Sequence, residues 1–232
     1  MRPRQVHCTF DITARPNGGV GVIGDSLTFS YFGGLDDALH AQRWGPIGIE
    51  ARSGRRTTVT IDGRVSATSG IDALRRLRGS GFGASIWVVA LGTNDTAFTA
   101  GNPAAADSLI DKMMAEIGAD RRVVWVNVFA KSSNAKARAV EFNGRLAAAT
   151  ARYPLLSIAD WFSLASANLG WFVDDVHTNF DGAVARNEFV AQAALVPRCP
   201  LVAPSVPLQV TPPPVVAATA TAVAVATQRC RV

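Results

Sequence analysis

The stretch that decides the fold of this 232-residue chain is GVGVIGDSL, at positions 19–27. Residues 20–23 are the apolar run available for a first strand, since RPNG at positions 15–18 is typical of a turn. The glycines also match G-x-G-x-x-G, but in dinucleotide-binding proteins that pattern follows a strand and opens a helix. Here the pattern contains the strand itself. We therefore interpret the match as accidental and set a nucleotide-binding fold aside.

Beyond this stretch, β-branched runs alternate with helical patterns, which indicates repeated βα units around a parallel sheet. Apolar runs such as IWVVAL at 86–91 are typical of parallel strands buried on both faces. The expected strands are residues 20–23, 47–51, 86–91, 123–129 and 155–158. The expected helices are residues 35–42, 71–78, 104–117, 134–152 and 182–195. We predict an α/β fold, a three-layer α/β/α sandwich of about five parallel strands, with its active site at the carboxyl ends of the strands.

Composition divides the chain into three parts. With 48% hydrophobic and 18% charged residues, it can bury one sizeable core. Seven of the 12 prolines fall within residues 197–214, and residues 215–227 contain only Ala, Val and Thr, which offer little apolar surface to offset their ordering entropy. We predict an N-terminal arm (1–18), a catalytic domain (19–196) and a C-terminal tail or linker (197–232). The last part could instead open a truncated second domain or form a strap along the first.

Charge and residue spacing argue against several partners. The net charge is +5, but the arginine pairs are scattered and no basic stripe with interleaved aromatics occurs, so we expect no nucleic-acid binding. Prolines and threonines interrupt the uncharged stretch 201–228, so we expect no membrane span there. Three cysteines without a C-x-x-C pair and three histidines provide too few suitably spaced ligands for zinc. We expect neither a metal nor a cofactor.

The cysteines also indicate the cellular compartment. No apolar run of signal-peptide length opens the sequence, although a mature fragment of an exported precursor remains an alternative. Cys199 and Cys230 bracket most of the tail, and Cys8 competes as a partner for Cys199. A disulfide persists outside a reducing cytosol. We therefore predict an extracellular or cell-envelope protein, with the cytoplasm as the alternative, and we predict that the chain beyond about residue 200 is dispensable for catalysis.

Ser26 lies at the carboxyl end of the first expected strand, where its hydroxyl can face the active-site crevice. A serine nucleophile needs a base within hydrogen-bond reach. His7 precedes the first strand, and His40 lies inside the first expected helix among polar neighbours. His177 follows the last strand and directly precedes a helix. By elimination, the predicted base is His177.

The remaining catalytic groups are expected near the same edge. An acid three residues before a histidine can accept from its Nδ1 and fix the tautomer that leaves Nε2 free, which favours Asp174, while the adjacent Asp175 stays an alternative. Gly54 and Asn94 follow the second and third expected strands and could donate hydrogen bonds to an oxyanion.

Together these residues resemble the SGNH hydrolases, also called GDSL lipases or esterases. GDSL at 24–27 resembles the first block of that family, Gly54 the second, GTND at 92–95 the third, and Asp174 with His177 the D-x-x-H of the fifth. The resemblance covers residues 20–195 and implies a flavodoxin-like strand order and ester chemistry without a metal. Thr178 and Asn179 depart from the pattern, since a proline or another small residue often follows the histidine.

The roles that the resemblance implies can be stated residue by residue. Ser26 is the expected nucleophile, His177 the general base and acid, and Asp174 the residue that orients His177. The expected oxyanion hole consists of the Ser26 N–H, the Gly54 N–H and the Asn94 side-chain amide.

We predict a serine esterase that removes short acyl groups, acetyl groups on carbohydrate included, through an acyl-enzyme. The expected partner is a small-molecule or carbohydrate ester. Acyl transfer by the same triad and a non-catalytic binding module on a hydrolase fold remain alternatives. The candidates for the pocket lining, which are equally suited to packing, are the residues of segment 55–58 and Phe29, Phe98, Trp171 and Phe172.

Overall fold

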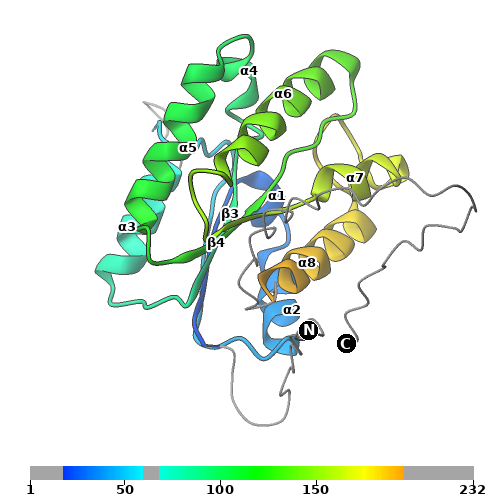
Figure 1. Cartoon of the computed structure of the whole chain (residues 1–232). Helices are drawn as coiled ribbons and strands as arrows, with labels where there is room; N and C mark the ends of the chain where they lie inside the picture. The colour runs from blue at the N-terminus through cyan, green and yellow to red at the C-terminus, as the bar shows by residue number, and fades with distance from the viewer. Residues whose placement is uncertain (1–17, 60–67, 196–232) are drawn as a thin grey trace, which may run out of the picture. The chain divides into compact units, whose positions relative to one another are not determined.

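The structure, a computed structural model, describes residues 18–59 and 68–195 (Figure 1). Its centre is a five-stranded parallel sheet in the order β2-β1-β3-β4-β5, which confirms the predicted α/β fold and flavodoxin-like strand order. The strands are β1 (Val20–Gly24), β2 (Ile47–Ala51), β3 (Ile86–Ala90), β4 (Arg122–Val126) and β5 (Leu156–Ala159). The predicted tail and residues 1–17 of the predicted arm lie outside the described residues, as do all three cysteines.

Helices cover both faces of the sheet and complete the three layers (Figure 1). One face carries α3 (Gly70–Gly79), α5 (Pro103–Ile117) and α6 (Ser133–Ala149), and the other carries α2 (Phe32–Ala41), α7 (Trp161–Ser166) and α8 (Phe180–Ala194). The remaining short helices are α1 (Ser26–Phe29), α4 (Thr96–Thr99) and the 3-10 turn η1 (Leu169–Trp171). Within the described residues, no helix is long and apolar enough to cross a membrane.

Side-chain alternation along the strands explains their continuous apolar runs. In β3, Ile86 and Val88 pack into one hydrophobic cluster, whereas Trp87 and Val89 pack into the other. Successive side chains of a strand point to opposite faces, and here both faces are covered by helices. Every residue of β3 is therefore buried.

The observed elements differ from the predictions mainly at their ends. The strand expected over 123–129 ends at Val126, because β5, its partner, ends at Ala159. Val128, two residues beyond it, is held by α6 instead, since Asn143 accepts from the Val128 N–H at 2.9 Å and donates to its carbonyl at 2.8 Å. The helix expected over 134–152 ends at Ala149. The short helices α1, α4 and α7 and the turn η1 were not predicted.

The glycines in β1, and the one just before it, are required by close packing. A Cβ at Gly21 would lie 2.3 Å from the ring of Trp87, and one at Gly19 would lie 2.2 Å from the Gly83 carbonyl oxygen. A Cβ at Gly24 would lie 2.5 Å from that of Thr28. The glycine pattern thus lets neighbouring strands and side chains approach β1, which gives the G-x-G-x-x-G match a structural reason.

Replacing Gly21 should test this packing. We expect Gly21→Ala to lower the free energy of unfolding by about 1–3 kcal/mol, because the Trp87 ring must shift to admit the methyl group. The matched control is Gly33→Ala in α2, where an added Cβ meets nothing within 4 Å. This control should lose no stability and gain up to about 0.5–1 kcal/mol. Urea unfolding followed by circular dichroism measures both, and equal stability of Gly21→Ala and the wild type would contradict the packing argument.

Candidate active site

The candidate site lies at the carboxyl edge of the sheet, where the exits of β1, β2 and β3 are adjacent because β1 is the central strand of the three. Ser26 is the first residue of α1. Asp25 caps this helix by accepting from the Leu27 N–H at 3.0 Å. A buried cap directly after the strand fixes where the Ser26 side chain leaves the backbone.

A chain of hydrogen bonds joins Ser26 to His177 and Asp174. Ser26 Oγ lies 3.0 Å from His177 Nε2, and His177 Nδ1 lies 2.8 Å from Asp174 Oδ2. These three side chains converge as the sequence predicts. His40 lies apart on α2, where its Nδ1 is 3.0 Å from the Asp36 carbonyl oxygen, and His7 is outside the described residues.

The loop before α8 holds Asp174 in its ionised form. Oδ1 of Asp174 accepts from the Val176 N–H at 2.8 Å and from the His177 N–H at 2.7 Å. These backbone donors, first that of His177, lower the pKa of Asp174 from 3.8 to about 2. The stabilisation is therefore present above about pH 4 and is lost as the pH falls toward 2. Asp174 is thus a carboxylate, suited to accept from the ring of His177, throughout the neutral range.

Asp175, the alternative acid, accepts hydrogen bonds from Ser132. Its carboxylate accepts from the Ser132 hydroxyl at 2.5 Å and from the Ser132 N–H at 3.2 Å. Its carbonyl oxygen accepts from the Lys131 N–H at 2.8 Å. Asp175 thus ties the histidine loop to the loop before α6, and the geometry favours Asp174 as the partner of His177.

Gly54 lies on the loop after β2, which a buried arginine fastens to the sheet. Gly54 has a φ of +71°, a conformation that glycine adopts at little cost. The next residue, Arg55, is fully buried and donates through Nη1 to the carbonyl oxygens of Gly24 at 3.2 Å and Glu50 at 2.5 Å. Burial lowers the pKa of Arg55, and the charge of Glu50 partly offsets this effect. Because Gly24 ends β1, Arg55 sets the Gly54 loop beside the Ser26 turn.

The loops after β2 and β3 are joined by a second set of bonds, which we call the loop clamp. It consists of Asn94 and Asp95 on one side and residues 55–57 on the other. Asn94 Nδ2 donates to the Arg55 carbonyl at 3.1 Å. Asp95 accepts from the Thr57 N–H at 3.0 Å, the Thr57 hydroxyl at 2.7 Å and Arg56 Nε at 3.2 Å. Burial raises the pKa of Asp95, and these bonds oppose that shift. The clamp places Asn94 beside the Gly54 loop.

A buried aspartate and a buried arginine lie under the nucleophile turn and were not singled out from the sequence. Asp25 is fully buried, and Arg186 of α8 is 2% exposed. Burial raises the pKa of Asp25, and the nearby positive charge of Arg186 opposes that rise. Arg186 also donates to the Thr28 hydroxyl at 3.4 Å. Arg186 therefore links α8, which follows the histidine loop, to the helix that carries Ser26.

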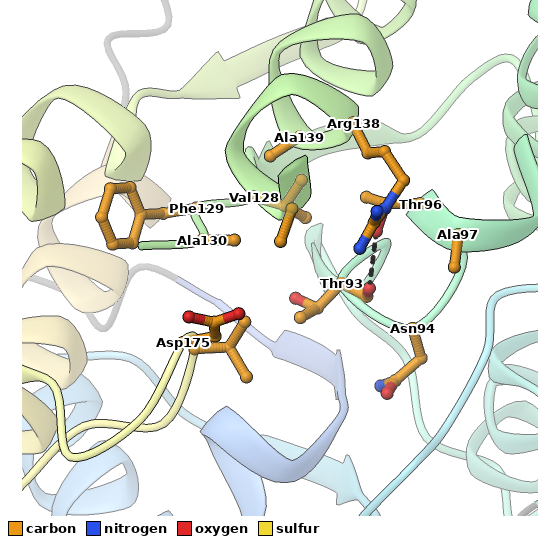
Figure 2. A pocket seen from close by; sticks show the side chains of 12 residues that line it. Thr93, Asn94, Thr96, Ala97, Val128, Phe129, Ala130, Arg138, Ala139 and Asp175 are labelled. Atoms are coloured by element: carbon orange, nitrogen blue, oxygen red, sulfur yellow. Dashed lines mark hydrogen bonds between the residues drawn. The ribbon is translucent and has the colours of Figure 1, made fainter. Parts of the chain in front are cut away.

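A pocket of about 310 Å³ adjoins these groups (Figure 2). It is lined by Thr93, Asn94, Thr96, Ala97, Val128, Phe129, Ala130, Ala135, Arg138, Ala139, Asp175 and Val176. The pocket therefore lies between the loop that carries Asn94 and the loop that carries His177.

None of the candidates for the pocket lining is among the residues that line this pocket. Phe29 and Phe98 are exposed, Phe172 is buried in the core, and Trp171 stacks on Trp161. Arg55 and Thr57 serve the loop anchoring described above, and Arg56 lies 3.8 Å over the Phe98 ring. Sequence reasoning missed Arg138 in the pocket, and its only signal was a basic residue on an amphipathic helix. Within residues 18–59 and 68–195, no three His, Cys, Asp or Glu side chains come together in a way that could hold a metal ion.

Comparison with solved structures identifies proteins of similar fold. The sequence matches no protein-family model and no curated protein. Three similar structures match this chain over 76–78% of its length and over 91–97% of their own length. They are the C-terminal catalytic domain of peptidoglycan O-acetyltransferase A from Streptococcus pneumoniae (18% identity, TM-score 0.55), a carbohydrate acetylesterase from Sinorhizobium meliloti (16%, 0.55) and a lipolytic G-D-S-L family member from Veillonella parvula (17%, 0.56). The fold of this chain is the SGNH/GDSL hydrolase fold, as its sequence motifs indicate.

The ring of His177 provides a test of the assigned carboxylate. We expect neutral His177 to carry its proton on Nδ1, because Asp174 accepts there, and Asp174→Asn to disturb this tautomer, since an amide can donate instead. Nitrogen-15 NMR of the imidazole ring measures the proton position. The matched control, Asp175→Asn, should leave the ring signals unchanged. Equal changes in the two variants would contradict the assignment.

Proposed function

We propose that this protein is a serine ester hydrolase with Ser26 as nucleophile. The observation that carries the proposal is the hydrogen-bonded chain from Ser26 Oγ through His177 to Asp174, located at the sheet edge beside Gly54 and Asn94. A serine hydroxyl becomes an effective nucleophile when a histidine can take its proton and a carboxylate orients that histidine. A binding module without catalysis has no need of this alignment.

In the proposed first step, His177 Nε2 takes the proton of Ser26 as Oγ attacks the ester carbonyl carbon. The C–O bond to the alcohol then breaks, and the alcohol leaves with the proton from His177. In the second step, His177 takes a proton from water, which attacks the acyl-enzyme. The Ser26–acyl bond breaks, the carboxylic acid leaves, and Ser26 regains its proton. Asp174 stabilises the imidazolium that forms in each step.

Three donors are available for the oxyanion of the tetrahedral intermediates. Within the described residues, the N–H groups of Ser26 and Gly54 donate to no protein acceptor. Asn94 uses one amide hydrogen for the Arg55 carbonyl and retains the other. Preorganised donors of this kind supply much of the rate enhancement in acyl transfer, because they need no reorientation as the charge develops.

The proposed substrates are esters with short acyl groups. The pocket of about 310 Å³ limits the size of a bound arm. The fold neighbours named as a carbohydrate acetylesterase and as a peptidoglycan O-acetyltransferase support an acetyl or similar group on a carbohydrate. The second of these names also favours acyl transfer to an alcohol as an alternative outcome, since an alcohol can replace water in the second step.

Hydrolysis of p-nitrophenyl esters of graded acyl length tests the proposed function. We expect activity on acetate and butyrate, and we expect Ser26→Ala and His177→Ala each to lower kcat by at least about 10³-fold, because the triad acts as a unit. The control, Asp175→Ala, should cost much less than Asp174→Ala. Hydrolysis that survives in Ser26→Ala would overturn the assigned nucleophile, and equal loss in the two aspartate variants would overturn the assigned acid. Adding a sugar alcohol and measuring the acylated product separates transfer from hydrolysis.

Asn94→Ala should lower kcat by about 10²–10³-fold with little change in KM, because a donor to the oxyanion acts mainly in the transition state. The variant also removes the bond to the Arg55 carbonyl, so a clamp control is needed. Arg56→Gln removes the ion pair with Asp95 but no oxyanion donor, and the two bonds from Thr57 to Asp95 remain, so we expect a clearly smaller loss of kcat than in Asn94→Ala. A change in Asn94→Ala that is confined to KM would instead make Asn94 a substrate-binding residue.

A further inference from the structure

Arg138 is a charged side chain in the pocket that the proposed mechanism does not use. It lies on α6 and lines the pocket opposite Asp175, with its guanidinium directed toward Thr93 and Thr96 (Figure 2). Its Nε is buried and has no hydrogen-bond partner. No hydrogen bond or ion pair joins the Arg138 guanidinium to any residue in the described part of the chain.

Two other arginines of this segment, Arg145 in α6 and Arg152 just after it, differ in this respect. Arg145 forms an ion pair with Asp107, and Arg152 forms one with Asp111 at 2.6 Å. A guanidinium nitrogen that is buried without an acceptor, as Nε of Arg138 is, carries a desolvation cost, which a bound anion can reduce. Arg138 is therefore the arginine of this segment that is suited to bind an anion from outside the chain.

The rest of the pocket provides no acceptor for this guanidinium. Its lining contains one acidic side chain, Asp175, and that carboxylate already accepts two hydrogen bonds from Ser132. The other lining side chains are uncharged. Arg138 is the only positively charged side chain among the lining residues. A carboxylate that enters the pocket would meet a planar donor fork, which matches the geometry of its two oxygens.

The pocket also has the right position for one arm of the ester. Asn94, which lines it, is a proposed oxyanion donor, and Val176 directly precedes the proposed base His177. A group held at the oxyanion site can therefore extend into the pocket. We propose that Arg138 determines specificity by binding a carboxylate on the acyl or alcohol arm of the substrate, so that the enzyme prefers anionic esters. This inference rests on the proposed ester hydrolase function.

Matched ester pairs test the inference and locate the charged arm. For the acyl arm, the mono-p-nitrophenyl ester of adipic acid is compared with p-nitrophenyl hexanoate. For the alcohol arm, 4-acetoxybenzoate is compared with its neutral methyl ester. In Arg138→Gln, we expect kcat/KM to fall about 10- to 100-fold for the anionic member of one pair, chiefly through KM, because a charge-assisted bidentate contact is lost. The neutral members should change by less than about 2-fold.

Two further variants separate recognition from structure. Arg138→Lys keeps the charge but not the donor fork, so it should restore part of the activity on the anionic ester. Arg121→Gln makes the same charge change at an exposed arginine before β4, at the opposite end of the strand from the site, and should alter neither pair. Equal loss on charged and neutral esters in Arg138→Gln, or no loss on either anionic ester, would overturn the inference while leaving the hydrolase function standing.

A binding measurement covers the case in which the wild type hydrolyses none of the four esters, so that the proposed function fails. Adipate is titrated calorimetrically into Ser26→Ala and into the double variant Ser26→Ala/Arg138→Gln, with adipamide as the neutral comparator. Adipate binding that is at least about 10-fold weaker in the double variant, with no such change for adipamide, supports an anion site at Arg138 independently of catalysis. Absent or equal binding of adipate in the two proteins would overturn it.

Discussion

The hydrogen bonds between the loop after β2 and the loop after β3 are the constraint on which the site geometry depends. Asp95, fully buried, accepts three bonds from Arg56 and Thr57, and Asn94 donates to the Arg55 carbonyl. A buried carboxylate is tolerated because these donors replace its water. Arg55 in turn reaches the last carbonyl of β1. The exits of three adjacent strands are thereby held as one unit, and Ser26, Gly54 and Asn94 all belong to it.

Much of this architecture can be predicted from sequence, because the physical causes are local. Continuous apolar runs predict strands buried on both faces. A serine, a glycine and an asparagine just after the first three strands, with a histidine after the last one, predict a site at one edge of one sheet. Strand and helix ends were less predictable, since Val126 ends β4 only because β5 ends beside it. The choice between Asp174 and Asp175 also depends on three-dimensional contacts, because both residues lie in one loop. Asp174 is bonded to His177, whereas Asp175 is bonded to Ser132.

The roles of the buried or partly buried arginines are the part of the site that the sequence predicts least. Three arginines have different roles in the structure. Arg55 anchors a loop, Arg138 lines the pocket and Arg186 lies beside a buried aspartate. Their roles depend on burial and on partners far away in the chain, which no local pattern encodes. The buried Nε of Arg138 has no hydrogen-bond partner, and this is evident only from the three-dimensional positions of the neighbouring acids.

The most direct test of the central claim, that Ser26 is activated by His177, is covalent labelling with phenylmethylsulfonyl fluoride followed by intact-mass and peptide mass spectrometry. The account predicts one adduct per chain, located on Ser26, forming at least about 100-fold more slowly in His177→Ala, because the hydroxyl then lacks its base. An adduct on another residue, or labelling of Ser26 at the same rate without His177, would contradict it.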